Sequence, residues 1–510
     1  MGVSRTVGAS QTRARATNSI RSARSLRTAP RTQGELVNDI HSQLNRTRVS
    51  SIVAPDSLKE VCQAIRWARS QRRSVCIAGG RHAMGGQQFG TDALLLDMTR
   101  MNRILSFDAE RAEVEVEAGI QWPELIAGLI EMQRGRPHQL GIIQKQTGAD
   151  RLSLGGALAA NIHGRGLSLK PIIGDVESFV IVDADGIASK CSRSENAELF
   201  RLAIGGYGLF GIITRITLRL AARRKLERIV RIENLEKLIP AFEERISEGF
   251  LYGDFQFMTD STSPDFLSRG VFSCYRPVPD DTPIPSQHRE LAPDDWRRLL
   301  LLAHADKKRA FDLYSAHYLS TNGQVYWSDT HQLSVYLDDY HRKLDSTLGA
   351  DRGSEMITEV YVPREKLVDF MAHVSEDFRG NSVDLIYGTI RLIEKDEESF
   401  MPWAKGRSAC IVFNLHINHD RLGVEKAKRD FRRLIDRAIS YGGSYYLTYH
   451  RWATREQVLA CYPQFPEFLR LKLKHDPAES FQSDWYRHYR QTLADPPTQP
   501  PYFNPQKSTR

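Results

Sequence analysis

Apolar and polar positions alternate along most of this chain with periods that indicate mixed α and β structure. Residues 58–70 carry apolar side chains at helical spacing directly after the segment PDS at 55–57, which predicts a capped helix. A short apolar run, VCIA at 75–78, predicts a strand, and LLL at 94–96 predicts another. Residues 112–119 alternate strictly, so we expect a third strand with one solvated face.

The second half of the chain carries strand and helix patterns in turn. Residues 355–374 read as strand, turn and helix, and residues 385–393 and 410–417 have the composition of strands. Residues 424–439 predict a basic amphipathic helix. These elements fit an antiparallel sheet with helices on one face. A further helix, predicted over 296–318, is expected to be an insertion without a catalytic role.

Length and cysteine usage limit the class of protein. A chain of 510 residues is too long for one ordinary core, so we expect two or three domains, or one large domain with a cap. The six cysteines show no CxxC or CxH pairing, which argues against a disulfide scaffold and against a zinc site, and no metal is expected. Free cysteines favour a reducing, cytoplasmic location. No apolar stretch approaches the ~18 residues of a membrane span, so we expect no transmembrane segment.

The formal net charge of +8 belongs largely to one end of the chain. Residues 1–34 hold seven arginines and no acidic residue, and we expect a disordered basic tail there. An arginine-rich, acid-poor leader is also typical of organelle targeting, which is the alternative to a cytoplasmic location. A basic nucleic-acid-binding protein is an alternative of another class, but a tail-borne charge gives no reason to expect nucleic acid as a partner. The proline-rich residues 496–510 predict a second disordered tail.

Three glycine clusters stand out: GGRHAMGGQQFG at 79–90, TGADRLSLGGALAANIHGRG at 147–166 and GGYGLFG at 205–211. The third contains a formal GxGxxG, yet a helix pattern precedes it and a strand pattern follows, the reverse of a Rossmann dinucleotide site. Each cluster alone is explained by tight turns. Together, with small residues between the glycines, they predict bare backbone amides that hold an extended, dinucleotide-sized ligand.

The order of these motifs resembles a known family. IAGGRHAMGG, VEAGIQWPEL, LSLGGALAANIHGRG, GDVESFVIVDADG and ELFRLAIGGYGLFGIITRITLRL together resemble the FAD-binding domain of the vanillyl-alcohol oxidase and p-cresol methylhydroxylase (PCMH-type) family. The resemblance is strongest toward the aldonolactone and alditol oxidases and the decaprenylphosphoryl-ribose oxidases. It implies an α+β fold, with a two-part PCMH-type FAD-binding domain and an antiparallel-sheet cap that binds substrate. The implied boundaries are 35–222 for the FAD-binding domain, 223–443 for the cap and 444–495 for a segment that returns to the FAD-binding domain.

The resemblance also implies which residues contact FAD. They are Gly79, Gly80, Arg81, His82, Ala83, Ser153, Gly155, Gly156, Asn161, His163, Gly164 and Ile213. Many family members have Gly-Gly-His-Ser in the first loop and attach that histidine covalently to the flavin. This chain keeps His82 but has Arg81 and Ala83 beside it, so covalent attachment and simple packing against the flavin both stay open. His163 is open too, between flavin contact and a hydrogen-bonded structural role.

The same resemblance implies an FAD-dependent oxidoreductase that oxidises a CH–OH group of a sugar-like or lactone-like small molecule by hydride transfer to flavin N5. The candidate catalytic residues are Tyr449, His450 and Arg451, at the junction after the cap, and Arg391 in the cap. A base must reach the hydroxyl proton, and a cation or donor should stabilise the reduced flavin. Oxygen or an electron carrier would re-oxidise the flavin. A CH–NH or C=C oxidoreductase, similar to cytokinin dehydrogenases or sterol reductases, is the alternative within enzymes.

Overall fold

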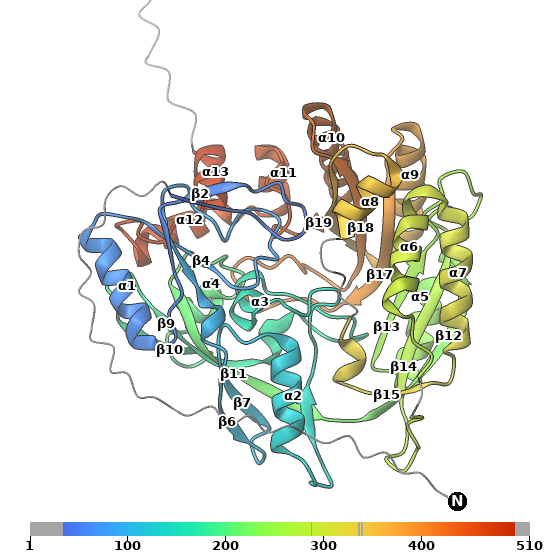
Figure 1. The fold of residues 1–510 in the computed structure, drawn as a ribbon, viewed down its shortest axis with the longest axis horizontal. Helices are drawn as coiled ribbons and strands as arrows, with labels where there is room; N and C mark the ends of the chain where they lie inside the picture. Colours follow the sequence, from blue (N-terminus) through green and yellow to red (C-terminus); the bar gives the residue numbers. More distant parts are fainter. Residues whose placement is uncertain (1–33, 287, 335–336, 338–339, 495–510) are drawn as a thin grey trace, which may run out of the picture. The chain divides into compact units, whose positions relative to one another are not determined.

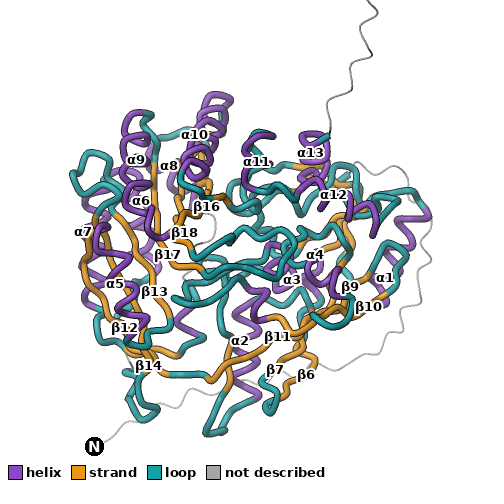
Figure 2. The backbone as a smooth tube through the Cα atoms, turned by 180° about the vertical axis from the view of Figure 1, so that it is seen from behind, coloured by secondary structure: helices purple, strands orange, loops and turns teal. Residues whose placement is uncertain are grey.

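The computed structural model describes residues 34–286, 288–334, Leu337 and 340–494, and Figures 1 and 2 show their backbone. The two predicted tails fall outside the described residues, apart from Gly34. Within the described ranges, none of the helices combines the length and apolar character that crossing a membrane requires.

A small parallel sheet follows the first strands of the chain. β1 (Glu35–Val37) pairs with β2 (Thr47–Val49), and β5 (Leu94–Asp97) lies between β3 (Ser51–Val53) and β4 (Val75–Ala78). Helix α1 (Leu58–Ser70) begins where the Ser57 hydroxyl accepts the Glu60 N–H, and it buries Val61, Ile65 and Ala68. The capped helix and both strands predicted in this region are confirmed.

An antiparallel sheet forms the centre of the N-terminal half. Its strands, in spatial order, are β10 (Ala188–Ser192), β9 (Val176–Val182), β11 (Ile212–Ala222), β7 (Glu113–Glu117) and β6 (Ile104–Asp108), and β8 (Leu140–Ile142) pairs with the end of β11. The helices of this half are α2 (Trp122–Met132), α3 (Leu154–Ala160) and α4 (Ala197–Ala203). β7 buries Val114 and Val116 while Glu113 and Glu115 are half-buried, as its alternation predicts. The third glycine cluster lies between α4 and β11, so the reversed order that argued against a Rossmann site is confirmed.

A larger antiparallel sheet follows. Its strands, in spatial order, are β15 (Val325–Trp327), β12 (Lys225–Asn234), β14 (Arg269–Pro277), β13 (Tyr252–Phe257), β17 (Leu385–Ile393), β18 (Ser408–Asn418), β16 (Gly353–Pro363) and β19 (Ser444–Tyr445). Its helices are α5 (Leu235–Ser247), α6 (Pro293–Ala305), α7 (Lys307–Ser320), α8 (Tyr340–Leu348), α9 (Leu367–Gly380) and α10 (Arg421–Ser440). One continuous apolar core joins this sheet to the central one.

Helices cover both faces of the large sheet, whereas the pattern predicted helices on one face only. Phe242 of α5 packs edge-on against Phe272 of β14, with ring centroids 4.9 Å apart. Three residues further along β14, the Tyr275 ring points to the other face and shares the Arg228 guanidinium with Tyr318 of α7. Figure 1 shows α6 and α7 at the edge of the molecule beside this sheet. The second helical layer was missed because strand alternation shows that a face is buried without showing what buries it.

The predicted helix at 296–318 is two helices, α6 and α7. The chain breaks at Asp306, whose backbone leaves helical geometry (φ −153°) and whose carboxylate caps α7 by accepting the Arg309 N–H at 3.0 Å. The segments on both sides of Asp306 satisfy a helical period, so the pattern continued across the break.

The C-terminal helices return to the N-terminal half of the chain, as Figures 1 and 2 show. They are α11 (Arg455–Cys461), α12 (Phe465–His475) and α13 (Asp484–Leu493). The Val75 N–H of β4 donates to the Ser480 carbonyl at 2.7 Å, and the Asp484 carboxylate accepts the N–H and hydroxyl of Thr91. Strand β4 therefore holds the last described segment of the chain directly beside the first glycine cluster.

Candidate functional site

A cavity of about 840 Å³ lies between the glycine clusters and the large sheet. This volume is within the ~300–1,000 Å³ typical of small-molecule sites. All three clusters contribute backbone to its wall: Gly79, Gly80, Gly155, Gly156, Gly208 and Gly211. Segments that lie more than a hundred residues apart in the sequence thus form one continuous surface.

The first two glycine loops need glycine because they press against each other. A Cβ atom on Gly79 would lie 1.9 Å from the Ser153 hydroxyl, and one on Gly80 would lie 2.1 Å from the Arg151 carbonyl. Any side chain at either position would push the loops apart. Glycine at the start of GGRHAMGG therefore lets the second loop approach, and the two loops together present backbone to the cavity.

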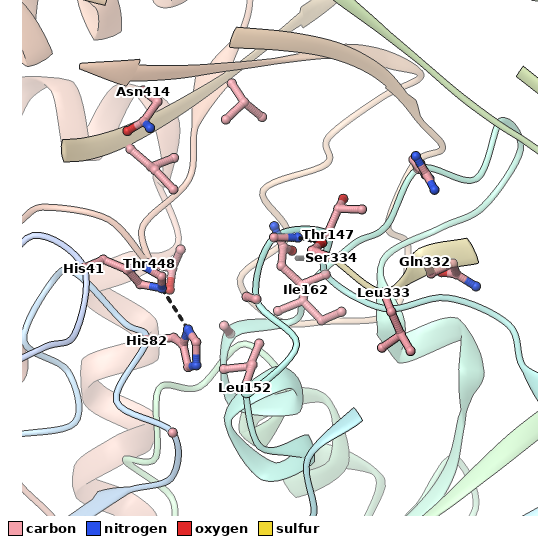
Figure 3. A pocket seen from close by; sticks show the side chains of 18 of the residues that line it. His41, His82, Thr147, Leu152, Ile162, Gln332, Leu333, Ser334, Asn414 and Thr448 are labelled. Atoms are coloured by element: carbon pink, nitrogen blue, oxygen red, sulfur yellow. Dashed lines mark hydrogen bonds between the residues drawn. The ribbon is translucent and has the colours of Figure 1, made fainter. Parts of the chain in front are cut away.

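His82 lies on the cavity wall at the end of a histidine pair. Figure 3 shows its ring below His41, and the His41 Nε2 and His82 Nδ1 atoms are 2.8 Å apart. Burial, and then the neighbouring His41, lower the pKa of His82 to about 3. The ring is therefore neutral at physiological pH and retains a nucleophilic nitrogen. Arg81, before it, has a left-handed backbone (φ 58°) and pairs with Asp97 at 3.1 Å.

The opposite wall of the cavity is one face of the large sheet. Alternate residues of adjacent strands line it: Asp254 and Gln256 of β13, Tyr387 and Arg391 of β17, and Val412 and Asn414 of β18. The Arg391 side chain is buried, and among the described residues its Nε and Nη1 atoms find no hydrogen-bond partner. The same holds for the side-chain oxygens of Gln256 and Asn414. Buried polar atoms without partners are costly, so this wall fits a ligand rich in oxygen and nitrogen atoms.

A buried polar network supports the end of this wall. Tyr449 lines the cavity and donates to Glu359 Oε2 at 3.2 Å, and Tyr361 donates to Glu359 Oε1. His163 Nε2 lies 2.7 Å from the same Oε1 atom, while its Nδ1 lies 2.9 Å from the Gly164 carbonyl. The carbonyl can only accept, so Nδ1 carries a proton. Burial raises the pKa of Glu359, but the His163 charge and these hydrogen bonds outweigh burial and leave that pKa below its usual value.

The structure brings most of the predicted site residues to the cavity and leaves five elsewhere. The wall includes Gly79, Gly80, Arg81, His82, Ala83, Ser153, Gly155, Gly156, Ile213, Arg391 and Tyr449. Among the described residues that line it, Asn161, His163, Gly164, His450 and Arg451 are absent. Asn161 ends α3 in a left-handed conformation and binds Asp396 at 2.8 Å, and the His450 ring stacks on Trp452 at 4.3 Å.

Other wall residues were not singled out in the sequence. They are Asp254, Gln256 and Asn414 on the sheet, and Trp296, Tyr314 and Tyr318 on α6 and α7. The predicted helical insertion thus contributes aromatic residues to the cavity wall, and the expectation that it has no catalytic role stays a prediction. The sequence did contain a signal for the sheet residues, because polar side chains occur at strand positions that face inward. An apolar core would not accept such side chains, so they indicate a cavity there.

The cavity fits the FAD that the glycine motifs imply. Glycine loops with exposed backbone form one side, as an extended diphosphate requires, and partnerless polar atoms on the sheet face form the other. The neutral His82 lies on the side of the first glycine loop.

Comparison with known proteins agrees with this geometry. A family described as "FAD binding domain" matches residues 49–192. The chain is 31% identical to L-gulonolactone oxidase of Mus musculus over 36% of this chain and 36% of the mouse protein. It is 24% identical to L-gulono-1,4-lactone dehydrogenase of Mycobacterium tuberculosis over 86% and 95%. It is 22% identical to decaprenylphosphoryl-beta-D-ribose oxidase of Mycolicibacterium smegmatis over 86% and 94%.

The alignments differ in extent. Those with three relatives, including the mouse oxidase, cover only 36–42% of the relatives' own length, while the two mycobacterial alignments run nearly from end to end. The family match contains the first and second glycine clusters and ends before the third. From its motifs, its cavity and the family match, the chain contains an FAD-binding domain, and its sequence is similar to those of lactone oxidases and dehydrogenases and of decaprenylphosphoryl-beta-D-ribose oxidase.

Proposed function

We propose that this protein oxidises a CH–OH group of a sugar-like or lactone-like substrate, with FAD as the hydride acceptor. The single observation that carries the proposal is the shared cavity, in which the glycine loops face a sheet wall of partnerless polar atoms. The names of the relatives, lactone oxidases and dehydrogenases and a ribose oxidase, support a polyhydroxylated substrate.

The same cavity supports a domain architecture in which the glycine loops and the large sheet belong to different domains. Residues 35–222 with 444–495 would form a two-part PCMH-type FAD-binding domain, and residues 223–443 would form the cap. The support is that β11 ends at Ala222 and the large sheet begins with β12 at Lys225. The contact of β4 with the C-terminal segment supports the second part.

In this proposal, the residues of the cavity divide into two groups. Gly79 and Gly80, with the second loop, hold the diphosphate, and His82 lies at the flavin ring. FAD bound there supplies a hydride acceptor at N5. Arg391 donates hydrogen bonds to substrate or flavin oxygens. The Tyr449 hydroxyl donates its one proton to Glu359 and can accept a hydrogen bond from the ligand; burial raises the pKa of Tyr449 well above its usual value, so the hydroxyl keeps that proton. The substrate loses a hydride and a proton and becomes a carbonyl compound.

The proton of the reacting hydroxyl requires an acceptor within hydrogen-bond reach. Asp254 is a buried carboxylate of the wall, and the pairing of Phe255 with Ile390 makes Asp254 the cross-strand neighbour of Arg391. We assign Asp254 the role of proton acceptor. His450 and Arg451, as neighbours of Tyr449, would position that residue without touching substrate.

The test is anaerobic reduction of the bound flavin by a panel of aldonolactones, alditols and simple alcohols, followed by steady-state kinetics of two variants. Arg391→Gln should lower kcat/KM by about 10- to 100-fold, the loss of a charge-assisted hydrogen bond of ~1.5–3 kcal/mol. Arg407→Gln is the matched control, because that side chain is 59% exposed. If no polyol or lactone bleaches the flavin, or if both variants behave alike, the proposal is wrong.

A further inference from the structure

One face of the large sheet continues beyond the cavity into a cluster of histidines. Glu355 of β16 and His416 of β18 are directly paired across the two strands. Each lies two residues beyond a cavity-lining residue, Ile357 and Asn414 respectively, and therefore points to the same side of the sheet. Side chains of such pairs start ~4.5–5.5 Å apart, close enough to share one ligand.

Two helices bring further imidazoles to this pair. His304 of α6 places Nε2 3.1 Å from Glu355 Oε1, and His341 of α8 places Nε2 2.8 Å from Glu355 Oε2. The His304 and His416 rings meet edge to face, with centroids 5.0 Å apart and planes at 89°. Three imidazoles from three elements thus surround one carboxylate. Its side chain is only 6% exposed, and those of His304 and His341 are 5% and 13% exposed.

The donor set suits a transition-metal ion. One ligand atom each from His304, Glu355 and His416 lie within 4.8 Å of one another. Zinc bonds of ~2.0–2.2 Å in a tetrahedron separate ligand atoms by about 3.4 Å, so the ligand atoms would have to approach one another by up to about 1.4 Å when the ion binds, which side-chain rotation can supply.

We propose that His304, Glu355 and His416 form a zinc site, and that His341, now bound to the second oxygen of Glu355, turns its ring to become the fourth ligand. Four protein ligands would then close the coordination sphere, as in structural zinc sites. Imidazole donors suit zinc, copper, iron and nickel, and zinc is the one of these that structural sites of four protein ligands hold most often. The spacing along the chain gave no hint of this site, because its ligands come from α6, α8, β16 and β18.

A zinc ion bound there would link helix α6, which covers part of the cavity, to the large sheet. Trp296, Leu299 and Ala303 of α6 line the cavity, yet no apolar residue of α6 is buried. Apolar packing therefore contributes little to the stability of this helix. A metal ion that joins His304 to β16 and β18 would provide the missing stabilisation. Ion binding would then stabilise the cover, because binding energy at such a site is also folding energy.

The test uses the tag-free, full-length flavoprotein after removal of metal with a chelator. Titration with Zn²⁺ in competition with a chromogenic chelator should show one tight equivalent per chain. The variants His304→Gln and His416→Gln should lose that equivalent, and His138→Gln, which removes an exposed histidine outside the cluster, should keep it. Co²⁺ should give the intense visible absorption of a four-coordinate site, and Zn²⁺ should slow hydrogen exchange in residues 293–305 of the wild type.

Each outcome decides the proposal. Absence of a saturable site in the wild type, a weak octahedral Co²⁺ spectrum, or tight binding that survives in both variants would overturn it, and the cluster would then be a hydrogen-bonded one. If His304→Gln loses its flavin absorbance and fails to fold, His341→Gln and the wild-type Co²⁺ spectrum carry the test. The readouts are independent of turnover, so they stand whether or not the proposed oxidase activity is found.

Discussion

Replacing Glu359 by glutamine tests the buried network beneath the cavity. The side chains of Glu359 and His163 are both fully buried, and the carboxylate also accepts from Tyr361 and Tyr449. Glutamine keeps the size of the side chain but removes the charge that balances His163. Breaking a buried ion pair costs about 3–5 kcal/mol. We expect a loss of about 3 kcal/mol, the lower end of that range, because glutamine still offers an oxygen that can accept one of these hydrogen bonds.

The dependence on pH follows from the direction of the shift. The pKa of Glu359 is lower in the folded protein than its usual value, because the His163 charge and the hydrogen bonds outweigh burial. Such a group stabilises the fold fully above its unfolded pKa of ~4.3 and loses that contribution as the pH falls through the folded pKa. The difference between wild type and variant should thus be complete at pH 7, persist to about pH 5 and shrink only at lower pH.

The assay is urea unfolding followed by tryptophan fluorescence between pH 4 and 8. Glu376→Gln, an exposed carboxylate of α9, is the matched control and should leave the unfolding midpoint unchanged. A double-mutant cycle with His163→Gln should show coupling of 1 kcal/mol or more, on the order of measured buried pairs. A Glu359→Gln variant as stable as wild type at pH 7, or a difference that grows at acid pH, would refute the ion-pair interpretation.

Three further outcomes are expected. Gly80→Ala places a Cβ 2.1 Å from a backbone carbonyl, so it should cost about 3 kcal/mol and lower the flavin content of the purified protein, whereas Gly406→Ala, with open space around it, should keep the wild-type flavin content. Acid precipitation should leave flavin in the wild-type pellet and in the supernatant of His82→Gln; a colourless wild-type pellet would mean that His82 only packs against the ring. Lys145→Met should destabilise the fold by about 3 kcal/mol in thermal unfolding, because it leaves the Asp150 carboxylate, bound at 2.5 Å, without its buried partner; an unchanged midpoint would contradict this.

The sequence predicted helices and strands well where the pattern that determines them lies within the segment itself. Helix α1 and strand β4 have the bounds that periodicity gave them, since the Ser57 cap and the apolar run are local features. The three glycine clusters were also visible in the sequence, and their small residues indicated a close approach of backbones. The close approach of Gly80 to the Arg151 carbonyl is an example of such a contact.

What the sequence could not supply was the pairing of distant segments. Asp254 and Arg391 become neighbours only through the register of β13 and β17, and 136 intervening residues carry no trace of it. His450 shows the opposite case, because its place beside Tyr449 suggested chemistry, but its ring stacks on Trp452 and does not line the cavity. Long-range pairing and side-chain direction are tertiary properties, which single-residue motifs do not encode.

Along β16, every second residue serves a different purpose on the same side of the sheet: Glu355 in the histidine cluster, Ile357 at the cavity, Glu359 in the buried network. Each purpose can change by a point substitution without disturbing the other two. Insertion or deletion of a single residue would rotate all three side chains to the opposite side at once. This strand should therefore tolerate exchange of residues far better than any change in its length.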